Sequence, residues 1–195
     1  MVRQNNLTCF FIENYIKNTM KHWKTITREV KFKNPWWTYI IDKYSVDDAK
    51  EGEYHFCHTG GSAFTIPVLN DGRILMVNQY RYLNDRESIE FPGGGIKEGQ
   101  QPDDIARKEL IEETGLDGDL EKIGFFNPYN GVTDEICHVY IARKLKPSIE
   151  FLKDEHEEFE FVMLTIDGLE EKINSNIIYD GMTLAAWSLA RKHFI

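Results

Sequence analysis

The chain has 195 residues, of which 32 are acidic and 23 basic, so its formal net charge is −9. This length is enough for one core that needs no metal or disulfide to fold. The acidic surface disfavours nucleic acids and anionic membranes as partners, and an anionic ligand would need local arginines or divalent cations to bind.

The cysteines and the N-terminal segment bear on the cellular compartment. Cys9, Cys57 and Cys137 are odd in number and stand in no metal-binding or redox spacing, which favours a reduced protein of the cytoplasm. Residues 1–20 lack the apolar run of a secretory signal, and no stretch reaches the roughly 20 apolar residues of a membrane span. We expect residues 1–19 to be a disordered extension, or to result from a translation start assigned too far upstream.

Residues 20–58 are predicted to form a small N-terminal antiparallel sheet. Residues that favour strands cluster there, most densely over 36–41, where the sequence reads Trp-Trp-Thr-Tyr-Ile-Ile. Farther on, two apolar stretches, 62–69 and 73–79, flank an Asn-Asp-Gly sequence that favours a tight turn. The pattern predicts an antiparallel hairpin at this turn.

Pro102 and Gly115 mark the ends of the helix that the sequence predicts most clearly. Proline is favoured in the first turn of a helix, and glycine is favoured just after its last residue. A helix is therefore expected over 102–114.

The remaining elements follow the same kind of pattern. Strands are predicted over 137–145 and 159–166, then a short helix capped by Asp167 and an amphipathic helix over 181–194. Because strands and helices mix without a regular alternation, we expect an α+β fold, arranged as an α/β/α sandwich with a mixed sheet.

Three glutamates share one face of the predicted helix. Glu109, Glu112 and Glu113 are spaced i, i+3 and i+4, which places their carboxylates close together. A solvated acidic face is one interpretation. However, a glycine run over 93–95 precedes the helix, and its backbone can approach a ligand closely. Carboxylates beside such a loop suit Mg²⁺, with Mn²⁺ as a possible substitute.

The stretch from Gly94 to Leu116 resembles the Nudix box, a pattern of 23 residues with fixed spacing. The resemblance implies a pyrophosphohydrolase domain over 59–195, whose metal is held by the Gly93 carbonyl and by the three glutamates, with Glu113 also catalytic.

Two positions depart from the box. Gln100 stands where the family has a glutamate, and Lys108 stands where it has an arginine. In the family these side chains orient the metal-binding glutamates, so the replacements change supporting residues rather than ligands. Gln100 can accept a hydrogen bond from Lys108. Glu98, two residues earlier, is another candidate to provide the negative charge that the glutamate of the family supplies.

Ahead of the box, residues 79–82 read Gln-Tyr-Arg-Tyr and residues 89–94 read Ile-Glu-Phe-Pro-Gly-Gly. This order is similar to the entry to the box in the ADP-ribose pyrophosphatase branch of the family. This resemblance implies that Arg81 and Glu90 contact the substrate. The planar guanidinium of Arg81 is suited to hold a diphosphate by two hydrogen bonds. The alternative is a surface ion pair of Arg81 with Asp85 or Glu87.

Residues 127–135 resemble the loop that lines the substrate pocket in this branch, so Asn130 and Glu135 are candidate substrate-binding residues. Asn130 stands where the proline that marks ADP-ribose enzymes is expected. A subgroup that cleaves other nucleoside diphosphate sugars shares the remaining features. Pairing within the structure is an equally plausible use of Glu135.

An acidic segment over 153–158 precedes the predicted strand. A solvated connection is its simplest interpretation. In the resembling family a glutamate of this segment is the catalytic base or completes the metal cluster, which favours Glu157 over Glu155 here. His156 is an alternative base because its unperturbed pKa lies near neutrality.

Trp36 and Trp37 are candidates for stacking on a purine, although paired tryptophans in a strand more often belong to the core. In the resembling enzymes the N-terminal sheet is shared between two subunits, which implies a homodimer here.

The predicted function is Mg²⁺-dependent hydrolysis of a nucleoside diphosphate sugar, with ADP-ribose as the leading substrate. The alternatives are a non-catalytic sensor that binds a nucleotide-sugar, and a Nudix enzyme that acts on another derivative such as GDP-mannose.

Overall fold

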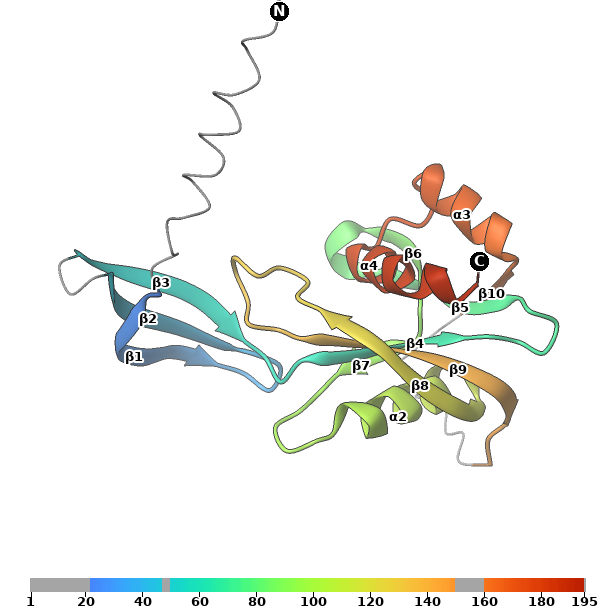
Figure 1. Ribbon diagram of the computed structural model, residues 1–195, viewed down its shortest axis with the longest axis horizontal. Coiled ribbons are helices and arrows are strands. Elements are labelled where there is room, and N and C mark those ends of the chain that lie inside the picture. Colours follow the sequence, from blue (N-terminus) through green and yellow to red (C-terminus); the bar gives the residue numbers. More distant parts are fainter. Residues whose placement is uncertain (1–21, 47–49, 150–159, 195) are drawn as a thin grey trace, which may run out of the picture.

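Three β-sheets and three α-helices make up the described part of the chain, which in this computed structural model comprises residues 22–46, 50–149 and 160–194 (Figure 1). None of the described helices is both long enough and apolar enough to cross a membrane.

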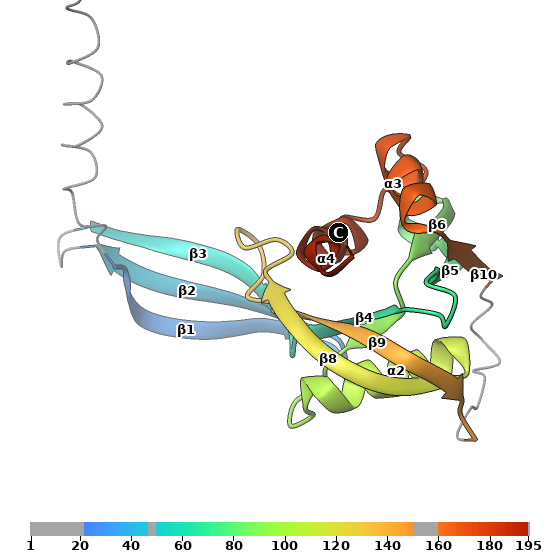
Figure 2. The ribbon, with the colours of Figure 1, turned by 45° about the vertical axis from the view of Figure 1, so that its right-hand side comes forward.

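The N-terminal sheet consists of β1 (Lys24–Lys33), β2 (Thr38–Val46) and β3 (Lys50–His58), paired antiparallel in that order. This confirms the predicted small antiparallel sheet. Every residue of β1 is exposed, whereas β2 buries alternate side chains. In both views the sheet projects to one side of the remaining elements (Figures 1 and 2).

Trp36 and Trp37 lie outside the strands, although they belong to the cluster that most favours a strand. The Asn34 side chain accepts hydrogen bonds from the backbone N–H groups of Trp36 and Trp37, at 2.9 and 2.8 Å. Both tryptophans therefore lie in a turn that follows β1, and β2 begins only at Thr38.

A four-stranded sheet forms the centre of the fold. Its order is β7 (Gly93–Gly95), β4 (Ser62–Pro67), β9 (Cys137–Pro147) and β8 (Leu116–Phe126). β4 and β9 are parallel, and the other neighbours are antiparallel, so the sheet is mixed as expected. A second sheet has the order β10 (Glu160–Leu164), β5 (Ile74–Arg81) and β6 (Arg86–Glu90).

The predicted hairpin over 62–79 is correct only at its turn. Leu69 N–H donates to Arg73 O at 2.8 Å, and one bridge joins Val68 to Ile74. Beyond that bridge the strands diverge, β4 into the central sheet and β5 into the second sheet. β4 buries all six of its residues, so it lies inside a sheet with a partner on each side rather than at the edge of a hairpin.

Helix α2 (Pro102–Thr114) has the predicted bounds. Pro102 opens it, and Gly115 ends it at a φ of 72°, a conformation that favours glycine. α2 contacts β4, β7 and β8, whereas α4 (Gly181–Ala190) covers the opposite face of the central sheet (Figure 1). This arrangement confirms the predicted sandwich.

The C-terminal elements differ in detail from the prediction. β10 ends at Leu164, because Thr165 caps α3 (Ile166–Asn174) by accepting a hydrogen bond from Gly168 N–H at 3.1 Å. Asp167 lies in the first turn of α3 and is not its cap. α4 ends at Ala190 and a short 3-10 helix follows, so the predicted helix was too long.

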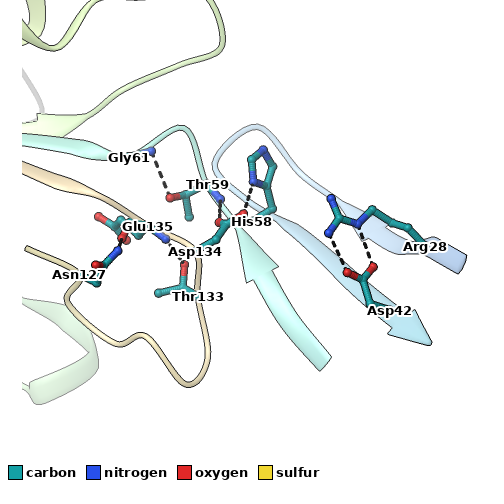
Figure 3. Close-up of polar contacts among 9 residues, drawn as sticks. All are labelled: Arg28, Asp42, His58, Thr59, Gly61, Asn127, Thr133, Asp134 and Glu135. Carbon is teal, nitrogen blue, oxygen red and sulfur yellow. Dashed lines mark hydrogen bonds and ion pairs between the residues drawn. The ribbon is translucent and has the colours of Figure 1, made fainter. Parts of the chain in front are cut away.

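The Arg28–Asp42 ion pair joins β1 to β2 and gives a prediction about pH (Figure 3). The hydrogen bonds from Arg28 lower the pKa of Asp42, so the pair stabilises the fold above the ordinary carboxyl pKa of about 4. Asp42→Asn is expected to lower the free energy of unfolding by about 1 kcal/mol near pH 7, a modest value because Arg28 is 57% exposed.

Denaturant titrations at several pH values measure this difference. It should vanish as the pH falls through the lowered pKa of Asp42. Asp71→Asn is the control, because the Asp71–Arg73 pair is local and exposed, and it should have a smaller effect. A loss from Asp42→Asn that stayed the same at acidic pH would contradict the assignment.

Candidate active site

Helix α2 lies against the glycine run of β7, and two of its glutamates face that run. Glu113 is 7% exposed, and its Oε2 accepts a hydrogen bond from Gly93 N–H at 3.2 Å. A Cβ on Gly94 would lie 2.5 Å from the carboxylate carbon of Glu109, and a Cβ on Gly93 would lie 2.6 Å from Ala63 O. The absence of side chains therefore allows β4 to lie close to β7 at Gly93 and the Glu109 side chain to lie close to β7 at Gly94.

Glu112, the third glutamate of the set, is engaged by a cation. Its carboxylate accepts a hydrogen bond from Lys108, whose Nζ also lies 3.5 Å from Glu109 Oε1. Burial would lower the pKa of Lys108, but the hydrogen bond to Glu112 and the charges of both glutamates raise it. Lys108 therefore neutralises part of the acidic face.

As the side chains stand, no three Asp, Glu, His or Cys residues within the described ranges are close enough together to hold a metal ion. The donor set nevertheless fits one. Its members are hard oxygens of three carboxylates and one backbone carbonyl, and the missing side chain of Gly94 lets the Glu109 carboxylate lie against the glycine run. Residues Gly93, Glu109, Glu112 and Glu113 are thus candidates to hold Mg²⁺.

The hydrogen bond expected between Gln100 and Lys108 is absent. Gln100 Oε1 instead accepts from Lys97 N–H at 2.8 Å, and Gln100 N–H donates to Lys97 O at 3.0 Å. Gln100 therefore closes a local turn ahead of α2. Of the two residues that depart from the box, Lys108 is the one that contacts the glutamates.

Arg81 pairs with Glu90, so the expected alternative of a pair with Asp85 or Glu87 is wrong. Nε of Arg81 donates to Glu90 Oε1 at 2.8 Å, and Nη2 donates to Oε2. This hydrogen bonding raises the pKa of Arg81. Asp85 accepts instead from the Tyr80 hydroxyl, and Glu87 from Asn78. Nη1 of Arg81 stays available for a ligand, because the pair with Glu90 uses only Nε and Nη2.

A cavity of about 340 Å³ lies beside this pair. It separates the β5–β6 hairpin from the segment that leads into α4. Its lining residues are Phe64, Arg81, Asn84, Ser88, Glu90, Tyr179, Asp180, Gly181 and Met182. Asn84, Ser88 and residues 179–182 were not predicted as site residues, because nothing in the local sequence indicates that segments some 90 residues apart meet.

The loop over 127–135 is attached to the edge of β3. Tyr54 hydroxyl donates to Gly131 O at 3.1 Å, Cys57 N–H donates to Val132 O at 2.9 Å, and the His58 ring is 2.8 Å from the Asp134 carboxylate (Figure 3). The N-terminal sheet therefore positions this loop.

Glu135 and Asn130 have different surroundings within that loop. Glu135 Oε1 accepts a hydrogen bond from the Ser62 hydroxyl at 2.7 Å, so Glu135 has the structural partner considered as its alternative use. Asn130 is exposed. The expectation that either residue contacts substrate stays a prediction.

Trp36 and Trp37 are exposed, at 76% and 40%, so they do not belong to the core. Thr38, the next residue, pairs with His58 at the end of β3, where the chain continues toward β4. The tryptophans thus lie at the end of the N-terminal sheet nearest the central sheet (Figure 1). The candidate bases Glu155, His156 and Glu157 lie outside the described residues.

Comparisons with known proteins agree on one family. A model of the NUDIX domain matches residues 59–179. The ADP-ribose pyrophosphatase of Bacillus subtilis (strain 168) and the methanol dehydrogenase activator of Bacillus methanolicus are each 30% identical over 165 residues, which is 84% of this chain and 89% of theirs. The crystal structure of an ADP compounds hydrolase matches with a TM-score of 0.78 at 17% identity, covering 90% of this chain and 96% of that one. At that identity the structural match shows the fold alone.

The contact between Gly94 and Glu109 gives a prediction about metal binding. A methyl group at Gly94 would displace the flexible Glu109 carboxylate rather than the backbone. Gly94→Ala is therefore expected to leave the melting temperature nearly unchanged and to weaken Mn²⁺ binding about tenfold or more, measured by titration followed by electron paramagnetic resonance.

Gly95→Ala is the matched control, because its added Cβ would meet no atom within 4 Å. It should bind Mn²⁺ like the unaltered protein. Equal affinities for all three proteins would exclude Glu109 from the metal site.

Proposed function

This chain belongs to the Nudix family and is a pyrophosphohydrolase, and we propose that it cleaves nucleoside diphosphate sugars, with ADP-ribose giving AMP and ribose 5-phosphate. The observation that carries the proposal is the packing of Glu109 and Glu113 against a glycine run, with Arg81 within electrostatic reach of Glu113. A diphosphate needs both cationic and metal-bound contacts, and in this proposal Arg81 provides the first while a metal held by the glutamates would provide the second.

We propose Mg²⁺, with Mn²⁺ as a possible substitute, as the metal of this site. The Gly93 carbonyl, Glu109, Glu112 and Glu113 would hold it, and when bound it would neutralise charge that builds on the phosphate oxygens. Lys108 competes for Glu112 and limits the negative charge of the set until the metal binds.

The protein's own residues bind and orient the substrate in this proposal. Glu90 fixes the guanidinium of Arg81, whose free Nη1 edge faces a phosphate. Glu157, or else Glu155, accepts a proton from the attacking water. Trp36 and Trp37 stack on the base, an interaction worth about 1–3 kcal/mol. Asn130 and Glu135 line the pocket from the loop that β3 holds.

A non-catalytic sensor of nucleotide-sugars is the second candidate. The pairing of Lys108 with Glu112 favours a sensor, because a lysine that remained bound to Glu112 would prevent this carboxylate from binding the metal. A rise in melting temperature with ADP-ribose and Mg²⁺, without any product, would support the sensor.

We infer a cytoplasmic location from the cysteines. Cys57 and Cys137, the two in the described part of the chain, are free thiols. Burial raises the pKa of Cys137 to about 12, so this thiol stays protonated and unreactive.

A substrate panel tests the proposed hydrolysis. ADP-ribose is expected to be the best substrate among ADP-ribose, ADP-glucose, GDP-mannose, UDP-glucose, NADH and diadenosine polyphosphates, assayed with Mg²⁺ and with Mn²⁺ for products that a phosphatase can cleave. A preference above roughly tenfold, about 1.4 kcal/mol, for a dinucleoside polyphosphate would overturn this choice.

Glu113→Gln supplies the inactive reference for that panel. Glutamine keeps an oxygen that can accept from Gly93 N–H, so the fold should persist while turnover falls about 100-fold or more. Glu121→Gln, an exposed substitution on β8, is the matched control. Near-normal turnover of Glu113→Gln with Mg²⁺ would remove this residue from the mechanism.

We also propose that the protein is a homodimer formed through the N-terminal sheet. β1 is exposed along its whole length and carries large apolar side chains, among them Ile26, Val30 and Phe32, each about half exposed. Exposed apolar side chains along a strand at the edge of a sheet favour a protein partner.

Val30→Glu is expected to shift the protein to monomer in sedimentation velocity, because a charge would be buried at the interface. Leu83→Glu is the control, since Leu83 is also an exposed apolar residue but lies on η1 (Tyr82–Asn84), away from β1. A dimer that survived Val30→Glu would place the interface elsewhere.

A further inference from the structure

Residues of β5 and β6 form one wall of the cavity beside Arg81, and the pairing of the two strands decides which side chains face it. Arg81 pairs with Arg86, Gln79 with Ser88, and Val77 with Glu90. Side chains directly opposite one another in an antiparallel pair lie on the same face of the sheet. Arg81, Ser88 and Glu90 therefore face the same space.

Tyr179 closes this space from the other side. Its hydroxyl donates to Glu87 O at 2.9 Å, and the Arg86 guanidinium carbon lies 3.5 Å from the centre of its ring. Asp180, Gly181 and Met182 follow, so the start of α4 also lines the cavity. The Asp180 side chain itself caps Thr183 N–H at 2.7 Å.

Ser88 is the feature that points to a ligand. It is 1% exposed, it lines the cavity, and its Oγ has no hydrogen-bond partner among the described residues. Buried hydroxyl groups are nearly always paired, because an unpaired one loses its hydration without replacement. A ligand that offers a hydroxyl group would supply the missing partner.

The other polar groups define the chemistry of that ligand. Arg81 offers its Nη1 edge to an anion, whereas Glu90, Ser88 and the Asn84 amide are suited to hydroxyl groups. The aromatic residues of the cavity are Phe64, which packs against Gly93, and Tyr179, one face of which Arg86 covers. A phosphorylated sugar matches these groups better than a base does.

The cavity also lies next to the candidate active site. Phe64 lines it and packs against Gly93, since a Cβ on that glycine would lie 2.8 Å from the Phe64 ring. The charge of Glu113 contributes to raising the pKa of Arg81. With a volume at the lower end of the range for small-molecule sites, the cavity suits half of a nucleotide-sugar.

We propose that this cavity binds the sugar phosphate half of the substrate, and that Ser88 and Asn84 select that half by its hydroxyl groups. The inference rests on the proposed function and extends it, because it assigns specificity for the leaving sugar to the β5–β6 hairpin and the start of α4.

Calorimetric titrations with ribose 5-phosphate and with inorganic phosphate test the proposal without any turnover. Ser88→Ala and Asn84→Ala are each expected to weaken ribose 5-phosphate binding about three- to tenfold and to leave phosphate binding unchanged, as expected for one lost hydrogen bond. AMP should bind all variants equally. Because Ser88 Oγ has no partner in the free protein, Ser88→Ala should not lower the melting temperature.

Ser175→Ala is the matched control, because its hydroxyl bonds to Glu171 O on α3, outside the cavity. Asn84 is exposed, so Asn84→Ala provides a second reading if Ser88→Ala misfolds. Three outcomes would each overturn the proposal: an equal loss of affinity for ribose 5-phosphate and for phosphate, a loss of affinity for AMP alone, or no loss of affinity for any of them. If the variants weaken ribose 5-phosphate binding as expected but the protein cleaves no nucleotide-sugar, the proposed hydrolysis is refuted and the proposed sugar site is supported.

Discussion

The close contact between helix α2 and the glycine run of β7 positions the glutamates that we propose as metal ligands. β7 pairs with β4, which is buried along its whole length, so the glycine backbone is held by the core of the central sheet. Glu113 accepts a hydrogen bond from that backbone, and Glu109 fills the space that a side chain on Gly94 would occupy. The glutamates are thus placed by the packing of the fold rather than by a flexible loop, which suits a site that must bind an ion with defined geometry.

Electrostatics explains why the acidic face tolerates its own charge. A chain with a net charge of −9 repels an anionic diphosphate at long range, so attraction has to come from local cations. Lys108 neutralises Glu112, and Arg81 neutralises the buried carboxylate of Glu90. Each cation keeps hydrogen atoms that its glutamate partner does not use, so the pair with Glu90 leaves the Nη1 edge of Arg81 open to the phosphate that we propose.

Local signals in the sequence predicted some elements and could not predict others. The bounds of α2 follow from Pro102 and Gly115, because helix ends depend on nearby residues. The hairpin over 62–79 was predicted wrongly, since the choice of partner for a buried strand depends on distant strands such as β9. The same reason hid the cavity, in which Ser88 meets residues 179–182. The glutamates of the box were found by spacing, but their pairing with Lys108 needed side-chain positions.

The attachment of the 127–135 loop to β3 links the N-terminal sheet to the substrate that we propose. If Trp36 and Trp37 hold the base, the sheet that carries them also fixes the loop through Tyr54, Cys57 and His58. The proposed sugar site lies on separate elements, the β5–β6 hairpin and α4, with Arg81 between the two halves. Recognition of the base and of the sugar would therefore depend on different sheets, so a substitution in one half should change specificity for that half while the diphosphate keeps its position. Independent selection of this kind would let relatives with the same box accept different nucleotide-sugars.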